Sequence, residues 1–177
     1  MKGSPAGGFQ LPPLALYIHI PWCVKKCPYC DFNSHAAGPS LPEQEYVDAL
    51  LADLDEDLGQ VHGRPLSSIF FGGGTPSLFS AQALGRLLEG IERRVPFAPD
   101  IEITLEANPG TFEQAKFKGY RSLGINRLSI GVQSFQEAKL KALGRIHNGD
   151  EAIRAADMAR AAGFDNFNLD LMHGLPQ

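Results

Sequence analysis

The sequence lacks any hydrophobic run long enough to cross a membrane, since no stretch approaches the roughly 18 apolar residues that a spanning helix needs. The first thirteen residues are rich in glycine and proline and lack the apolar core of a signal peptide. An excess of basic charge is also missing, because 16 Lys and Arg stand against 20 Asp and Glu. We therefore expect a soluble cytoplasmic protein that does not bind nucleic acid.

Cysteine is scarce, and its placement is informative. The 177 residues contain three cysteines, Cys23, Cys27 and Cys30, all within eight positions. An odd number of crowded thiols suits a metal or redox site in a reducing compartment better than a disulfide framework. This spacing agrees with a cytoplasmic location.

Apolar and β-branched runs alternate with helical patterns along the chain, and 44% apolar content is enough for one globular core. The predicted strands are 14–20, 68–71, 101–105, 127–132 and 166–171. Capping residues predict that helices begin at Ser40, Ser80, Thr111, Ser134 and Asp150. We expect two of these helices to end at Gly124 and Gly163.

Repeated strand–helix units predict an α/β fold with a parallel sheet, either an open doubly wound sheet or a (β/α) barrel. Both architectures bind ligands at the carboxyl ends of their strands. Polar or glycine-rich segments follow all five predicted strands: the cysteines, Gly72–Pro76, Glu106–Pro109, Gln133–Ser134, and Asp170 with His173–Pro176. The sequence therefore predicts a site at this edge of the sheet.

The cysteine motif Cys-x-x-x-Cys-x-x-Cys suits an iron–sulfur cluster, because three thiolates can hold three irons of a cubane and leave the fourth open to a ligand. One alternative is a zinc site completed by His19 or His35. Another is a thiol redox protein, since Cys27-Pro-Tyr-Cys30 is the active-site tetrapeptide of glutaredoxins. The third cysteine and the length of the chain argue against the redox protein.

Four segments together resemble the radical S-adenosylmethionine (SAM) enzymes: Tyr17–Pro21, the cysteine loop, Gly72–Pro76 and Gly131–Phe135. The resemblance covers roughly residues 14–177. It implies a partial (β/α) barrel, of which this chain would hold about five of six strands after a flexible arm over 1–13. The core domain over 14–177 would be truncated, and the C-terminal domain of relatives would lie outside the sequence.

The resemblance also implies a [4Fe–4S] cluster on the three cysteines. SAM would bind its open iron and be cleaved, after one-electron reduction, to methionine and a 5′-deoxyadenosyl radical. The residues that match SAM-contacting positions of the family are Tyr17, Tyr29, Gly73, Gly74, Thr75, Glu106, Gln133, Arg145 and Asp170. The alternatives are local: the glycines could form a tight turn, the carboxylates could be solvated, and Arg145 could pair with Asp150.

Within this family the chain is similar to the branch that contains oxygen-independent coproporphyrinogen III dehydrogenase and the HemW haem chaperones. The cysteine motif of the dehydrogenase resembles Cys-x-x-x-Cys-x-x-Cys-x-Cys, which ends in a fourth cysteine. In this sequence Phe32 occupies the position of that fourth cysteine. This difference favours a chaperone that binds haem and passes it to acceptor proteins. The alternative is an oxidoreductase of porphyrin biosynthesis that cleaves SAM.

The expected partners are haem or another tetrapyrrole, a haem-acceptor protein, an electron donor such as flavodoxin or ferredoxin, and a second copy of the chain through the edge of the last strand. Haem needs an axial ligand or covalent attachment, and the sequence offers His19, His35, His62, His147 and His173. None is assigned as a haem ligand. We interpret His19, which lies inside the first strand, as a structural residue.

Overall fold

Five parallel strands form the main sheet of the protein, which we describe from a computed structural model over residues 11–111 and 114–175. The strand order is β1-β4-β5-β6-β7, so each new strand is added on the same side of the last. The strands are β1 (Leu14–Ile20), β4 (Leu66–Gly73), β5 (Phe97–Ala107), β6 (Arg127–Gln133) and β7 (Asn166–Leu171). All five predicted strands are confirmed, and β4 and β5 are longer than predicted. Most of the predicted arm over 1–13 lies outside the described residues.

This sequential order decides between the two predicted architectures. A doubly wound sheet reverses its direction at a switch point, whereas here every connection runs the same way. Because such crossovers have one hand, their helices come to lie on the same face of the sheet. The arrangement is that of a partial (β/α) barrel, as predicted.

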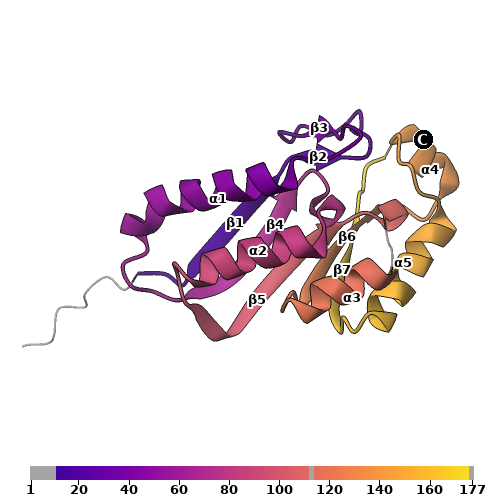
Figure 1. Cartoon of the computed structure of the whole chain (residues 1–177). Helices are drawn as coiled ribbons and strands as arrows, with labels where there is room; N and C mark the ends of the chain where they lie inside the picture. The colour runs from indigo at the N-terminus through magenta and orange to yellow at the C-terminus, as the bar shows by residue number, and fades with distance from the viewer. Residues whose placement is uncertain (1–10, 112–113, 176–177) are drawn as a thin grey trace, which may run out of the picture.

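The helices form one layer outside the sheet (Figure 1). α1 packs on α2, α2 on α3, and α3 on α5. The α-helices are α1 (Glu43–Asp57), α2 (Ala81–Glu92), α3 (Gln114–Ser122), α4 (Glu137–Ala142) and α5 (Gly149–Ala161), and the short 3-10 helices are η1 (Leu58–Gln60), η2 (Pro76–Leu78) and η3 (Pro109–Thr111). No helix of the described residues is both long and apolar enough to cross a membrane.

The core lies between the sheet and this helical layer. Alternate residues of β6, namely Leu128, Ile130 and Val132, are buried against the helices. The residues between them, including Ser129 and Gln133, face the opposite side, because side chains alternate along a strand. The period of two therefore separates an apolar packing face from a polar inner face.

The predicted starts of the first two helices have different outcomes. Ser80 caps α2 as predicted, and its hydroxyl accepts from the Ala83 N–H at 3.1 Å. The start predicted at Ser40 is wrong, because α1 follows Pro42 and has no side-chain cap. Glu43, the first residue of α1, accepts from the backbone N–H and hydroxyl of Ser80 at 2.7 and 2.6 Å. A tertiary contact has replaced the local one.

The cap predicted at Asp150 is also wrong. Asn148 caps α5, and its side chain and that of Glu151 bond reciprocally to the backbone at 2.9 and 2.8 Å. α4 begins at Glu137 without a capping side chain. The hydroxyl of Ser134 accepts from the backbone N–H of Gln136 at 3.1 Å, just ahead of that helix.

The helix ends predicted at glycine are confirmed. Gly124 and Gly163 have φ of 94° and 91°, and each lies two residues after the last residue of its helix, α3 or α5. At the start of α3, the Thr111 hydroxyl donates to the Asn108 carbonyl at 2.8 Å. The helix start predicted at Thr111 is followed by residues 112 and 113, which lie outside the described residues.

A second, small sheet was not predicted. β2 (Trp22–Cys23) and β3 (His35–Ala36) pair in parallel on either side of the cysteine loop. The pairing holds the two ends of that loop together.

Candidate cofactor-binding site

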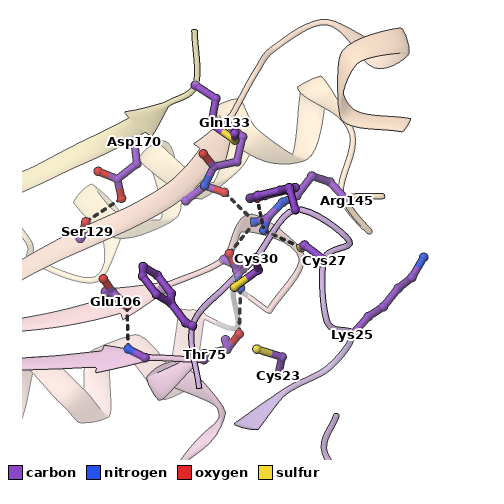
Figure 2. A pocket seen from close by; sticks show the side chains of 18 residues that line it. Cys23, Lys25, Cys27, Cys30, Thr75, Glu106, Ser129, Gln133, Arg145 and Asp170 are labelled. Atoms are coloured by element: carbon purple, nitrogen blue, oxygen red, sulfur yellow. Dashed lines mark hydrogen bonds between the residues drawn. The ribbon is translucent and has the colours of Figure 1, made fainter. Parts of the chain in front are cut away.

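A cavity of about 370 Å³ opens at the carboxyl edge of the sheet, within the size range of ligand pockets (Figure 2). Every predicted site residue except Tyr17 lines it. The lining residues that were not predicted are Lys25, Phe32, Ala107, Asn108, Ser129, Gly131 and Met172. The structure thus brings together residues from four strands of the main sheet, β4 to β7, and from the cysteine loop.

The glycine motif after β4 seats the cysteine loop. A Cβ on Gly74 would lie 2.6 Å from the carbonyl oxygen of Trp22, and one on Gly73 would lie 2.7 Å from the His19 ring. Gly73 also has a φ of 115°, which only glycine adopts without strain. The Thr75 N–H then donates to the Trp22 carbonyl at 2.7 Å. Glycine is therefore required here by contacts within the protein.

The donor set fits a cluster. Cys23, Cys27 and Cys30 are half-buried, unpaired thiols around one cavity. Among the described residues, no three His, Cys, Asp or Glu side chains come close enough to share one metal ion. A cubane takes one thiolate on each of three irons, and the three cysteines line the same cavity, as the predicted cluster requires.

His19, the suggested zinc ligand in the first strand, is engaged elsewhere. Its Nε2 donates to the Asn33 carbonyl at 2.7 Å, because a carbonyl can only accept. Its Nδ1 forms a hydrogen bond with the Tyr17 hydroxyl at 3.1 Å. The interpretation of His19 as a structural residue is confirmed.

The cysteine loop places its groups in different electrostatic surroundings. Burial raises the pKa of the Cys23 thiol, and the Thr75 hydroxyl beside it acts in the opposite direction. Arg145 donates to the Cys27 sulfur at 3.3 Å and to the Tyr29 hydroxyl at 3.5 Å. Burial also raises the pKa of Tyr29, and the Arg145 charge opposes this shift.

Arg145 is clamped between two strand ends. Its guanidinium donates to the Asn108 side-chain oxygen and, at 2.7 Å, to the Gly131 carbonyl. The amide of Asn108 in turn donates to the Thr75 hydroxyl at 2.9 Å. Arg145 Nε is buried without a hydrogen-bond partner in the described part of the chain, and the suggested salt bridge to Asp150 is not formed there. An unpaired buried donor at a cavity wall fits an anionic ligand.

Two carboxylates occupy the inner face of the sheet (Figure 2). Glu106 accepts from the Gly73 N–H at 3.2 Å, and Asp170 accepts from the Ser129 hydroxyl at 2.7 Å. Burial raises the pKa of Glu106 to about 7, and the charge of Asp170 adds to the shift. Both side chains can accept hydrogen bonds from hydroxyl or ammonium groups of a ligand.

Gln133 stands out by its backbone. Its φ of 66° lies in the left-handed region, which a residue with a side chain adopts at a cost of about 1–3 kcal/mol. Its carbonyl accepts from the Met172 N–H at 3.0 Å, and its side chain points into the cavity (Figure 2). The strained turn therefore directs a polar side chain toward the site.

Tyr17 lies on the same face of the sheet but outside the cavity lining. It is 57% exposed and stacks on Phe70 at a centroid distance of 6.2 Å. Its role as a SAM contact stays a prediction.

The alternation of side chains along the strands could have identified two of the missed residues. Ser129 shares the inner face of β6 with Gln133, and Asn108 follows Glu106 by two positions. The clamp of Arg145 by Asn108 had no signal in the sequence, because it joins positions 37 residues apart.

The radical SAM superfamily profile matches residues 17–177. Heme chaperone HemW of Escherichia coli is 60% identical over 167 residues, which cover 94% of this chain and 44% of that protein. HemW of Haemophilus influenzae is 59% identical, with 94% and 45% covered. The chain thus spans less than half the length of these relatives.

Among solved structures, coproporphyrinogen III oxidase (HemN) from Escherichia coli, described as a radical SAM enzyme, superimposes with a TM-score of 0.83. The two sequences are 33% identical, and the match covers 93% of this chain and 38% of that one.

Proposed function

Because the chain belongs to the radical SAM superfamily, we propose that it is the cluster-binding and SAM-binding part of a haem chaperone, which binds haem and passes it to acceptor proteins. Membership of the superfamily implies a [4Fe–4S] cluster and SAM as cofactors. When bound, they supply reductive cleavage of the SAM sulfonium. An electron donor such as flavodoxin or ferredoxin belongs to the same proposal.

One observation carries the proposal: three thiols, Arg145 and two carboxylates converge on a single cavity at the carboxyl edge of the sheet. Cys23, Cys27 and Cys30 would ligate three irons. Arg145 would donate to the methionine carboxylate of SAM, for which its buried Nε is available.

The remaining predicted contacts would surround the nucleoside and amino groups of SAM. Glu106 and Asp170 would accept from ribose hydroxyls or the ammonium group, and Gln133 would add an amide. Tyr29 would cover the cluster side of the cavity, where it is 39% exposed. Gly73, Gly74 and Thr75 would hold the cysteine loop against this wall, as their contacts with Trp22 and His19 support.

Phe32 favours the chaperone over the oxidase. It lines the cavity at the position where the oxidase pattern has a fourth cysteine. The similarity to HemW relatives supports the same branch, since heme chaperone is the function in their names. The second candidate, a SAM-cleaving oxidoreductase acting on a tetrapyrrole, is favoured by the structural match to the oxidase.

The first test is anaerobic iron–sulfur reconstitution, followed by electron paramagnetic resonance of the reduced protein with and without SAM. We expect a [4Fe–4S]⁺ signal that changes when SAM is added. Cys27→Ser should lower the iron content, whereas Ser67→Ala, a hydroxyl deletion that leaves the cavity unchanged, should not. Correctly folded protein that takes up no iron would contradict the proposal.

The second test separates chaperone from oxidase. Titration with haem should give a saturable change in the Soret absorbance with little turnover of SAM. Release of 5′-deoxyadenosine and carbon dioxide that depends on coproporphyrinogen III, without haem binding, would instead establish the second candidate.

A further inference from the structure

His147 is a buried histidine to which the proposed function gives no role. Its side chain is 4% exposed, and in the sequence it lies between Arg145, which lines the cavity, and Asn148, which caps α5. Its Nε2 donates to the Val132 carbonyl at 3.0 Å, because a carbonyl can only accept. The other ring nitrogen, Nδ1, is buried and has no hydrogen-bond partner in the described part of the chain. A buried polar group of this kind calls for an explanation.

The protein holds the His147 ring as a neutral donor. Burial lowers the pKa of His147, the bond to Val132 opposes this shift, and the charge of Arg145 adds to it. A neutral imidazole carries one proton, and the bond to Val132 places that proton on Nε2. His147 therefore makes one directed hydrogen bond, to the backbone of β6.

The carbonyl that His147 binds belongs to the strained turn at Gln133. The backbone N–H of Ser134 donates to the same Val132 carbonyl at 2.9 Å. A hydrogen bond between residues two positions apart, around a central φ of 66°, is the pattern of a classic γ-turn, which is rare and strained. Such a conformation persists only where the surrounding structure holds it. His147 supplies one of the contacts that hold it.

Alternate residues around His147 approach the chain on both sides of this turn. Arg145 donates to the Gly131 carbonyl at 2.7 Å, directly before the carbonyl that His147 binds. A Cβ on Gly149 would lie 2.5 Å from the carbonyl oxygen of Phe135, so this close approach requires glycine. A single segment of the chain therefore supports the turn and also supplies Arg145 to the cavity.

We propose that His147 is a positioning residue for SAM, which acts through the backbone at Gln133. The proposal rests on the proposed function, because it requires that SAM occupies the cavity that Gln133 lines. His147 itself is not part of the cavity lining. Its bond to Val132 stabilises the left-handed turn, and the turn directs the side chain of Gln133 into the cavity (Figure 2). Without this bond we expect the turn to relax and the amide to leave its position.

Two substitutions separate the hydrogen bond from the packing of the ring. His147→Gln keeps an amide N–H that can donate to Val132, whereas His147→Leu fills a similar volume without a donor. The dissociation constant for SAM, measured by calorimetry on the cluster-loaded protein, should rise about five- to tenfold in His147→Leu. It should stay within about threefold of the wild type in His147→Gln. The iron content should be equal in all three proteins, because His147 does not contact the cysteines.

A double-mutant cycle tests whether His147 acts through Gln133. Gln133→Gly removes the amide and lets the turn keep its positive φ without strain. In this background, replacing His147 with leucine should not weaken SAM binding further. A loss of the same factor in both backgrounds would mean that His147 supports the site only by packing, and this would overturn the proposal.

Hydrogen exchange of the cluster-free protein gives a readout that needs no cofactor. The Met172 N–H donates to the Gln133 carbonyl at 3.0 Å, so its exchange reports on the turn. It should exchange faster in His147→Leu than in the wild type and in His147→Gln. The amide of Ile130, a buried residue of the same strand, should exchange at one rate in all three proteins, which verifies that they are folded.

The two readouts together separate this inference from the proposed function. If the wild type binds SAM, and His147→Leu equals it in SAM affinity and in Met172 exchange, only the role of His147 is overturned. If the cluster-loaded wild type binds no SAM, the proposed function fails, and the exchange of Met172 alone then decides whether His147 holds the turn.

Discussion

Replacing Glu106 with glutamine should stabilise the protein above neutral pH. Burial, and then the charge of Asp170, raise the pKa of Glu106 from 4.5 to about 7, although the Gly73 N–H opposes the shift. Between these two values the native state keeps a proton that the unfolded chain has released. Stability is therefore greatest below the unfolded pKa and falls as the pH rises through the folded pKa. Glutamine keeps an acceptor for Gly73 and carries no charge.

The size of the effect follows from the shift. A shift in the pKa of Glu106 from 4.5 to about 7 lowers the free energy of unfolding by about 3 kcal/mol once the pH is above both values. About 2 kcal/mol of this loss develops between pH 5.5 and pH 8.5. The free energy of unfolding of the variant, relative to the wild type, should rise by about that amount over this interval. Glu106 lies on the inner face of the sheet beside Asp170, so the penalty arises from a carboxylate held away from water and next to a second one.

Urea unfolding of the cluster-free wild type and Glu106→Gln at the two pH values measures this difference. Glu102→Gln is the matched control, because it removes a carboxylate from an exposed position of the same strand. A difference between Glu106→Gln and the wild type that is equal at both pH values would refute the reasoning. The burial of Glu106 would then not govern its ionisation.

Three further substitutions test the contacts that shape the site. Gly74→Ala should lower the iron content after reconstitution, since its methyl group would lie 2.6 Å from a backbone carbonyl of the cysteine loop; unchanged iron content would contradict that role. Asn108→Ala should weaken SAM binding about tenfold in calorimetry at constant iron content, because Arg145 loses one of its acceptors. Ser80→Ala should lower the free energy of unfolding by about 1–2 kcal/mol in urea, because it removes a helix cap and a partner of Glu43; a loss below a few tenths would mean that solvent replaces both bonds.

The alternation of strands and helices predicted the fold, and the segments that follow the strands predicted much of the candidate site; the period of two within the strands accounts for residues that were missed. Side chains on the inner face of β6 recur at every second residue, so Ser129, Gly131 and Gln133 share one side. The carboxyl ends of parallel strands meet at one edge, which brings Glu106 and Asp170 to the same cavity as the cysteines. These features depend on local periodicity and on the direction of the strands, and both can be inferred from the amino-acid sequence.

The capping residue of a helix could be predicted only where a single suitable side chain lies near the start of that helix. Ser80 has no competitor and caps α2 as predicted. Asn148 and Asp150 are both good capping residues, and the backbone conformation at position 148 decides between them. Ser40 does not cap α1, and Glu43 forms a hydrogen bond with Ser80, a residue 37 positions away. Propensity alone does not contain such long-range competition.

The sequence by itself determined the strand–helix alternation, the edge at which the site forms and the three thiols that can hold a cluster. The tertiary structure alone decided that Asn108 and Gly131 clamp Arg145, and that Gly74 seats the cysteine loop. Each of these depends on the distance between residues far apart in the chain, which is known only once the sheet, its helices and its loops are packed together.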